Sequence, residues 1–425
     1  MRINLAYGSG YLPVELPDST TLIEPSQAPG LADEHAAVLS ALEYPVAAVP
    51  LRELLQPDSR VCIVFTDKTR ATPNDRLIPW LLEYLDAVPR ENITLLNSLG
   101  THRPNTTAEL EHMLTPEVVS RFRVLNHEPE NPKALIPLGT TRDGTPALLN
   151  RHFVEADVRI VTGFIEPHFF AGFSGGPKGI MPGVAGLKTV MSNHGPENIG
   201  DPNATFGITR GNPIWEEMRD IALRPGPSFL LNVALNERRQ ITGVFAGDLV
   251  AAHRLGCEFV KQSAMQGVAA PFDIVVTTNS GYPLDLNLYQ GVKGLSAGAR
   301  ILKPGGALIL ACECREGVPP GSSYDRILRA ASGLEEILAQ LASAPAPLPE
   351  QWQAQIQALI QRRARVHLHS SLPDEAVKAA HLIPCPDIGV AVAGMLEARG
   401  KNATVAVLPQ GPVTIPYVLD NPAGA

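Results

Sequence analysis

The sequence predicts an α/β fold: two α/β domains with mainly parallel sheets and a candidate site in the interdomain cleft. Short β-branched runs alternate with helical stretches, which is the pattern of βαβ units. The 425 residues exceed what one hydrophobic core usually holds, so two domains are expected. Several predicted strands run directly into polar or glycine-rich sequence, and ligands of open α/β sheets bind beyond the carboxyl ends of strands.

Six β-branched runs are the predicted strands, and they cover residues 61–65, 93–97, 159–162, 274–278, 307–311 and 403–408. The predicted helices include residues 249–263, 324–342 and 351–365, the last two joined by an Ala/Pro-rich linker at 343–349. A break between the first of these helices and the following strand predicts a domain boundary near residue 268. We therefore expect an N-terminal domain over 1–268, a C-terminal domain over 269–409, and a tail, 410–425, that returns to the first domain.

Composition argues against several classes of partner. The chain has 35 Lys+Arg against 43 Asp+Glu, a net charge of -8 and a pI near 5.8, so it lacks the basic surface that nucleic acid requires. No segment approaches 18 uninterrupted apolar residues and the amino terminus lacks a signal-peptide pattern, so no membrane association is expected. Five scattered cysteines fit a reducing compartment, and a cytoplasmic location is expected.

Two islands of sequence carry most of the candidate chemistry. Residues 100–104 read GTHRP, and residues 166–178 read EPHFFAGFSGGPK, with His194 shortly after. Three histidines, at 102, 168 and 194, and Lys178 thus lie in loop-like sequence, where side chains reach ligands more readily than they fill a core. The first four predicted strands all lead into such segments, so we expect the candidate residues at one sheet edge.

A third motif, Asp67 to Arg70, follows the first predicted strand. The planar guanidinium of Arg70 is suited to binding a carboxylate through two hydrogen bonds. Asp67 could equally cap a helix beside a surface arginine. The motif alone does not decide between these interpretations.

The glycine-rich segment 174–183 predicts a loop that could place backbone N–H groups against a phosphate. It lacks the G-x-x-x-x-G-K-[ST] spacing of a P-loop, which disfavours nucleoside triphosphate hydrolysis. Lys178 could carry a covalently attached cofactor, because a desolvated amine is nucleophilic, or it could be a solvated loop lysine. The candidate cofactor contacts are Lys178, Ser174, Gly175, Gly176, Pro182 and Gly183.

His194 has no companion ligands at a diagnostic spacing. It is either a structural histidine or the single protein ligand of a metal held mainly by an organic cofactor. In the second domain, Tyr289, Gln290 and Lys293 lie on neighbouring positions of one predicted helical turn. They could close over a ligand or form an ordinary hydrated face.

Together these five motifs resemble those of the nickel-dependent lactate racemase family, in order and approximate spacing over nearly the whole chain. The resemblance implies two α/β domains and a nickel-pincer nucleotide, the pyridinium-3-thioamide-5-thiocarboxylic acid mononucleotide, made by cofactor-maturation enzymes. It implies that Lys178 is tethered to this cofactor and that His194 binds nickel. His102 and His168 would be the acid/base pair. Arg70, Gln290 and Lys293 would orient the substrate, supported by Asp67 and Tyr289.

The implied reaction is racemisation of a small 2-hydroxy acid. The C2 hydrogen is too weakly acidic for a protein base, so it would leave as hydride to an electrophilic ring while a histidine takes the hydroxyl proton. Lactate or a related short-chain acid is the leading substrate, and malate, an aromatic acid or a sugar acid is the alternative within the family. A nicotinamide dehydrogenase is disfavoured because G-x-G-x-x-G does not follow the first strand. A non-catalytic protein that binds an anionic metabolite is the alternative outside enzymes.

Overall fold

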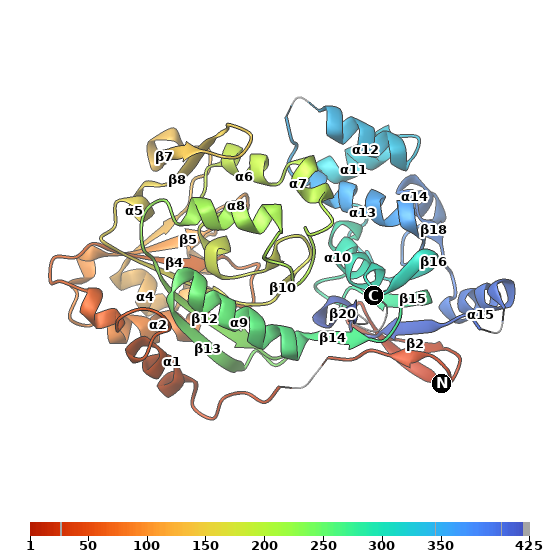
Figure 1. Cartoon of the computed structure of the whole chain (residues 1–425), viewed down its shortest axis with the longest axis horizontal. Helices are drawn as coiled ribbons and strands as arrows, with labels where there is room; N and C mark the ends of the chain where they lie inside the picture. Colours follow the sequence, from red (N-terminus) through yellow and green to blue (C-terminus); the bar gives the residue numbers. More distant parts are fainter. Residues whose placement is uncertain (26–27, 345, 401, 420–425) are drawn as a thin grey trace, which may run out of the picture. The chain divides into compact units, whose positions relative to one another are not determined.

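A computed structural model describes residues 1–25, 28–344, 346–400 and 402–419 of the chain. The chain divides into two compact units (Figure 1). The large unit comprises the described residues of Gln27–His194 and Asp201–Lys261. The small unit comprises those of Met1–Ser26, Gly195–Gly200 and Gln262–Ala425. Each unit contains a six-stranded sheet and helices, which confirms the predicted α/β class with mainly parallel strands.

The sheet of the large unit has the strand order β13-β12-β9-β4-β5-β6. Neighbouring strands are parallel except for β12 and β13, which are antiparallel. The strands are β4 (Val61–Thr66), β5 (Ile93–Ser98), β6 (Arg123–Asn126), β9 (Val158–Phe164), β12 (Phe229–Leu235) and β13 (Ile241–Asp248). Two small hairpin sheets accompany it, β7 (Leu135–Thr140) with β8 (Pro146–Asn150), and β10 (Pro167–His168) with β11 (Gly172–Phe173).

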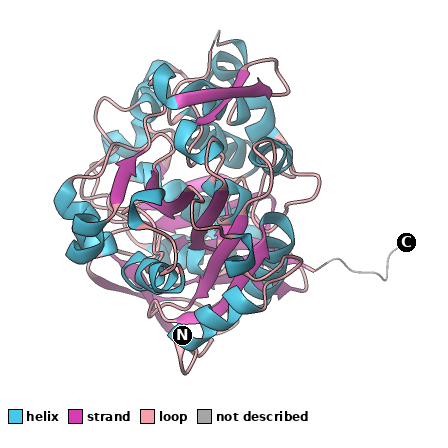
Figure 2. Cartoon of the chain, turned by 90° about the vertical axis from the view of Figure 1, so that its left-hand side faces the viewer, coloured by secondary structure: helices cyan, strands magenta, loops and turns pink. Residues whose placement is uncertain are grey.

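Helices lie on both sides of this sheet (Figure 2). Apolar side chains of the first four helices form one core with alternate strand residues, including Ile63 and Phe65 of β4. Cys62 and Val64 are also buried, so β4 reads as a continuous apolar run because both of its faces are covered. The helices are α1 (Glu34–Glu43), α2 (Asn74–Tyr84), α3 (Thr107–Leu114), α4 (Pro116–Arg121), α5 (Arg151–Val154), α6 (Leu187–Asn193), α8 (Pro213–Ala222) and α9 (Leu249–Ala264).

The small unit has an entirely parallel sheet in the order β18-β17-β16-β15-β19-β3. Its strands are β3 (Thr21–Leu22), β15 (Phe272–Thr278), β16 (Leu302–Ala311), β17 (Arg365–His369), β18 (Ile383–Pro384) and β19 (Val405–Leu408). Two further pairs are β1 (Arg2–Tyr7) with β2 (Gly10–Glu15), and β14 (Met265–Val268) with β20 (Ile415–Val418). The helices are α7 (Pro196–Gly200), α10 (Leu288–Ala299), α11 (Ser323–Ala330), α12 (Leu334–Ser343), α13 (Gln351–Arg363), α14 (Asp374–Ala379) and α15 (Ile388–Arg399).

The six predicted strands and helix 249–263 match observed elements to within a few residues. The predicted helix 324–342 was wrong as one element, because Gly333 adopts an extended backbone and separates α11 from α12. The predicted helix 351–365 ends at Arg363, because residues 365–369 form β17 instead. The linker 343–349 includes Pro345, which lies outside the described residues, and its other members are mostly exposed.

The compact units group the chain differently from the expected domain boundaries. The first residues, assigned by sequence to the N-terminal domain, join the small unit, where β3 pairs with β19. Residues 415–418 pair with β14 at the expected boundary, and residues 420–425 lie outside the described part. The boundary near 268 and the return of the tail to the N-terminal domain stay predictions.

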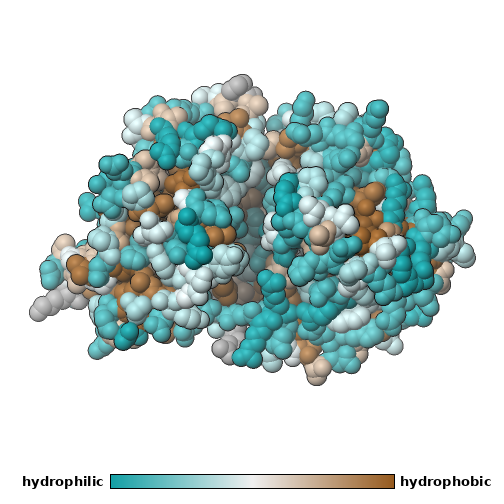
Figure 3. All heavy atoms as spheres, turned by 180° about the vertical axis from the view of Figure 1, so that it is seen from behind, coloured by the Kyte–Doolittle hydropathy of each residue, from teal (hydrophilic) through white to brown (hydrophobic). Residues whose placement is uncertain are grey.

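Two surface properties bear on possible partners. None of the described helices is long and apolar enough to cross a membrane. The face of the molecule seen in Figure 3 is mainly hydrophilic, with small hydrophobic patches scattered over it. Neither observation adds a partner to those expected from the sequence.

Candidate active site

Three neighbouring parallel strands of the large unit lead into the candidate residues. Asp67 follows β4, His102 follows β5, and His168 follows β9. Strand β4 lies between β9 and β5, and the carboxyl ends of parallel strands meet at one sheet edge. The topology therefore brings the three motifs to the same edge, as expected. The fourth predicted strand, 274–278, is β15 in the sheet of the small unit, so the expectation of one edge for all four strands was wrong.

Asp67 and His102 form the clearest polar pair at this edge. The Nδ1 atom of His102 lies 2.8 Å from Asp67 Oδ2, and the Thr69 hydroxyl donates to Asp67 Oδ1 at 2.8 Å. Burial raises the pKa of Asp67, but the hydrogen bonds from His102 and Thr69 and the charges of His102 and Arg70 lower it overall. The ionised carboxylate thus holds the proton of a neutral His102 ring on Nδ1, which leaves the lone pair on Nε2. The His102 side chain is 44% exposed, so it remains accessible.

The loop that carries His102 contacts the glycine-rich loop that carries Lys178. The Gly100 N–H donates to the Gly183 carbonyl at 2.9 Å, and the Ser98 hydroxyl donates to the Gly179 carbonyl at 3.1 Å. A side chain at Gly183 would overlap both the Gly179 carbonyl and the Ser98 hydroxyl. The two sequence islands are therefore packed against each other.

Within the glycine-rich loop, most of the predicted cofactor contacts shape the loop itself. The Ser174 hydroxyl donates to the Phe164 carbonyl at 3.0 Å. Gly175 and Gly176 have positive φ angles of 75° and 53°, which glycine adopts without strain. The Gly176 N–H donates to Asn232 Oδ1 at 2.8 Å, and the Gly183 N–H lies 3.4 Å from the Lys178 carbonyl. Contacts of Ser174, Gly175, Gly176, Pro182 and Gly183 with a cofactor stay predictions.

His253, on α9, packs against this loop. Its Nε2 lies 2.9 Å from the Ser174 carbonyl, and a side chain at Gly176 would overlap its ring. Burial lowers the pKa of His253 to about 4, against the opposing effect of the Ser174 carbonyl. His253 is therefore neutral near pH 7 and donates its single N–H to the loop.

His168 is held differently from His102. Its Nδ1 accepts a hydrogen bond from the Ala171 N–H at 3.2 Å, so the proton of the neutral ring is on Nε2. The rings of Phe169 and Phe170 lie 5.0 and 4.5 Å from the His168 ring, and Phe170 also contacts the His194 ring at 5.0 Å. The Phe170 ring thus contacts both His168 and His194.

His194 follows α6 and is only 4% exposed. Burial and, to a smaller extent, the positive charge of Lys178 together lower its pKa to about 3. Lys178 is therefore close enough to act electrostatically on His194, and the imidazole is neutral near pH 7, the form that binds a metal ion. Among the described residues no three His, Cys, Asp or Glu side chains form a metal site. This donor set fits a metal whose remaining ligands come from a cofactor attached at Lys178.

The remaining predicted residues belong to the small unit and lie on α10, as expected from their spacing. Tyr289, Gln290 and Lys293 occupy its first two turns and are half-buried. Asn287 caps the helix by accepting from the Gln290 N–H at 3.1 Å. The Gln353 amide of α13 donates to the Tyr289 carbonyl at 2.6 Å, so two side chains hold the first turn of α10.

Sequence reasoning missed four residues that position the site, namely Asn193, Glu217, Asn232 and His253. Glu217 carried a detectable signal, because it lies on the apolar face of α8 with Ile214, Met218 and Ile221, all buried. A carboxylate on such a face requires polar partners. No comparable signal distinguished the others from ordinary core residues.

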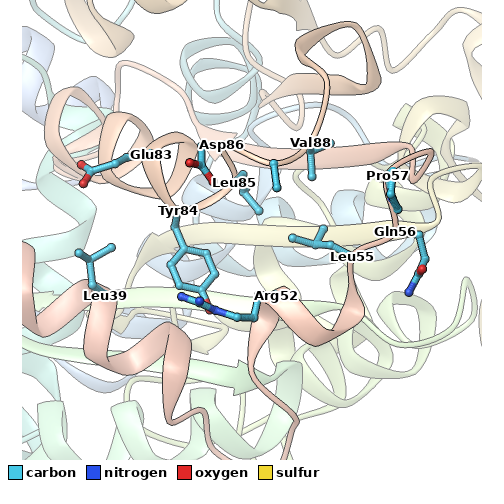
Figure 4. A pocket seen from close by; sticks show the side chains of 11 residues that line it. Leu39, Arg52, Leu55, Gln56, Pro57, Glu83, Tyr84, Leu85, Asp86 and Val88 are labelled. Atoms are coloured by element: carbon cyan, nitrogen blue, oxygen red, sulfur yellow. The ribbon is translucent and has the colours of Figure 1, made fainter.

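A pocket of about 510 Å³ lies elsewhere on the large unit (Figure 4). Arg52 lies under the Tyr84 ring there at 4.9 Å and pairs with Glu43. Tyr84 ends α2, the helix that runs from the carboxyl end of β4 to the start of β5. The pocket therefore lies at the amino edge of the sheet, opposite the candidate residues, and none of the candidate site residues lines it.

Comparison with known proteins agrees with this arrangement. A family model described as the lactate racemase N-terminal domain matches residues 7–207, and one described as the lactate racemase C-terminal domain matches residues 268–415. A lactate racemase of Thermoanaerobacterium thermosaccharolyticum is 34% identical over 96% of this chain and 98% of its own length. A lactate racemase of Lactiplantibacillus plantarum is 35% identical over 89% of this chain and 90% of its own.

Solved structures give the same result. The lactate racemase apoprotein of T. thermosaccharolyticum superposes with a TM-score of 0.91 at 33% identity, covering 99% of this chain and all of that one. A Thermotoga maritima protein shares the fold with a TM-score of 0.65 at 20% identity over 91% of this chain and 98% of its own. The chain belongs to the lactate racemase family.

Proposed function

We propose that the chain interconverts the D and L forms of a 2-hydroxy acid, lactate or a related short-chain acid, using a nickel-pincer nucleotide held by Lys178 and His194. The observation that carries this proposal is a lysine close enough to act electrostatically on a buried, neutral histidine, on a loop packed against the segment that leads to His102. The names and near-complete coverage of the relatives support it. When bound, the nucleotide supplies an electrophilic ring that can accept hydride from C2 of the substrate.

The two catalytic histidines start from different protonation patterns. His102 has its lone pair on Nε2 and can take the hydroxyl proton, while Asp67 stabilises the charged ring that results. His168 has its proton on Nε2 and can donate a hydrogen bond to the hydroxyl or keto oxygen. To act as a base in the opposite direction, His168 must first move that proton to Nδ1, at the expense of its hydrogen bond from Ala171.

The substrate carboxylate and side chain require separate contacts. Arg70 is half-buried and close enough to Asp67 to affect its ionisation, which suits a cation that binds a carboxylate near His102. Phe169 and Phe170 flank His168 and offer an apolar surface for a methyl or short alkyl group. The substrate roles of Gln290, Lys293 and Tyr289 stay predictions from the family resemblance.

The test is to co-express the chain with cofactor-maturation enzymes, then measure intact mass, nickel content and conversion of D-lactate to L-lactate. We expect a mononucleotide-sized adduct with nickel, and racemisation. Lys178→Ala should lose all three, whereas Lys188→Ala, an exposed lysine on α6, should retain them. An adduct without turnover would direct the search to larger 2-hydroxy acids. The absence of any adduct would contradict the cofactor role and favour a non-catalytic binding protein.

A further inference from the structure

The orientation of the Asn193 side chain is determined by two neighbours. Its Nδ2 lies 2.8 Å from Glu217 Oε2 and 3.2 Å from the Ile214 carbonyl. A carboxylate and a carbonyl both accept hydrogen bonds, so the amide must present its NH2 group to them. Asn193 Oδ1 is therefore the atom that faces His194, at 3.1 Å from Nδ1.

This orientation also determines where the His194 ring carries its proton. An amide oxygen only accepts, so His194 Nδ1 must donate. A neutral imidazole has a single N–H, and hence Nε2 carries the lone pair that a metal ion requires. Metal-binding histidines commonly have this second hydrogen bond, which fixes both the tautomer and the orientation of the ring.

Glu217 cannot easily reverse this arrangement. Its side chain is buried, with the residue only 3% exposed, and its other oxygen, Oε1, accepts from the Arg142 N–H at 2.7 Å. A backbone N–H cannot become an acceptor, so Oε1 stays an acceptor, and the Ile214 carbonyl keeps the Asn193 NH2 group turned toward Oε2. The Arg142 N–H and the Asn193 amide both donate to Glu217, and His194 Nδ1 donates to Asn193, so donation converges on the Glu217 carboxylate from both sides.

We propose that Glu217, acting through Asn193, is a positioning residue that sets the tautomer of His194 for metal binding. The metal-binding part rests on the proposed function, whereas the tautomer concerns the chain alone. Glu217 does not touch the reacting groups. It acts by keeping the His194 proton on Nδ1 and the lone pair on Nε2.

The sharpest test is Glu217→Gln, which preserves size but replaces one acceptor by a donor. The Gln oxygen will stay with the Arg142 N–H, so its NH2 group will face Asn193. Two NH2 groups then face each other, and we expect the Asn193 amide to turn at the expense of its hydrogen bond to the Ile214 carbonyl. Its NH2 group then faces His194, and the His194 proton moves to Nε2. Glu216→Gln is the matched control, because Glu216 is adjacent on α8 and bonds the Gly211 N–H and, at 3.5 Å, the exposed Arg142 guanidinium, but neither Asn193 nor His194.

The measurement is a long-range 1H–15N spectrum of the metal-free, full-length protein with 15N-labelled histidine. The chain has 11 histidines, and His194→Gln identifies the signal. We expect protonated Nδ1 in the wild type and in Glu216→Gln, and protonated Nε2 in Glu217→Gln. Protonated Nε2 in the wild type, or an unchanged tautomer in a folded Glu217→Gln, would overturn the proposal. Even if the variant does not fold, the wild-type spectrum tests the His194 tautomer, because protonated Nε2 there would overturn the proposal.

Nickel retention after cofactor loading is a second measurement. Loss of an outer partner of a metal ligand typically costs about 10–100-fold in metal affinity, so Glu217→Gln should retain nickel that much less tightly than Glu216→Gln. Equal retention by the two variants would overturn the metal-binding part. If the tautomer switches but the wild type itself never binds nickel, the tautomer assignment is supported and the proposed function fails instead.

Discussion

His102 and His194 lie in two loops of the same unit and show how burial and partner decide what an imidazole can do. His102 is substantially exposed and its Nδ1 faces the Asp67 carboxylate. His194 is buried and its Nδ1 faces an amide oxygen. A carboxylate stabilises the charged ring, whereas a neutral amide in a desolvated site does not. The first histidine is suited to gaining and losing a proton, and the second to offering a lone pair.

The largest expected effect comes from breaking the exposed pair with Asp67→Asn. The Asn oxygen will stay with the Thr69 hydroxyl, so its NH2 group will face His102 and force the His102 proton onto Nε2. Loss of a positioned general base typically costs about 10²–10⁴-fold in rate, and we expect kcat for racemisation to fall within that range. The control is Lys68→Gln, because Lys68 pairs with Glu109 and not with His102. A kcat for Asp67→Asn within twofold of the control would contradict the role of the pair.

The next effect tests how burial keeps a histidine neutral, using His253, which, like His194, is buried. Its pKa is about 4 in the fold and 6.5 when unfolded, so between these values the unfolded chain binds more protons. Stability must therefore fall as pH is lowered below 6.5. At about 1.36 kcal/mol per pKa unit, the loss at pH 4.5 is about 3 kcal/mol. Urea unfolding at pH 7.5 and 4.5 should show a larger loss of unfolding free energy for the wild type than for His253→Gln. Equal losses in the two proteins would contradict the low pKa of His253.

A smaller effect tests whether the His102 and Lys178 loops depend on each other. In Gly183→Ala the new methyl group overlaps the Gly179 carbonyl and the Ser98 hydroxyl, and such overpacking costs about 1–3 kcal/mol. We expect a lower melting temperature and faster hydrogen exchange around residues 98–103. Gly394→Ala, in α15, meets no atom within 4 Å and should be neutral or slightly stabilising. Exchange that changes only within 176–183 would show that the loops are independent.

The smallest expected effect is that of Thr69→Ala. The hydroxyl donates one hydrogen bond to Asp67, and such a bond contributes about 0.5–1.5 kcal/mol. Its loss should weaken the orientation of Asp67 without removing the carboxylate, so kcat should fall by only a few fold. A loss as large as that of Asp67→Asn would mean that Thr69 acts directly on His102.

The sequence predicted the elements that run through a core and missed the contacts that depend on tertiary packing. The apolar run of β4 and the polar residues after it were visible, because burial on both faces and a loop at the strand end leave a local pattern. The break at Gly333 was missed, since the helical pattern continues on both sides. Asn193, Glu217 and His253 act through neighbours that the fold brings together, and local sequence does not record those neighbours.

The most direct test of the central claim is the fate of the substrate C2 hydrogen. D-Lactate labelled with deuterium at C2 should be incubated with the loaded protein in ordinary water, and the L-lactate formed analysed by mass spectrometry. If the hydrogen leaves and returns as hydride while the histidines move only the hydroxyl proton, the L-lactate keeps its deuterium. L-Lactate with solvent hydrogen at C2 would show that a protein base removes the C2 proton, and would contradict the account.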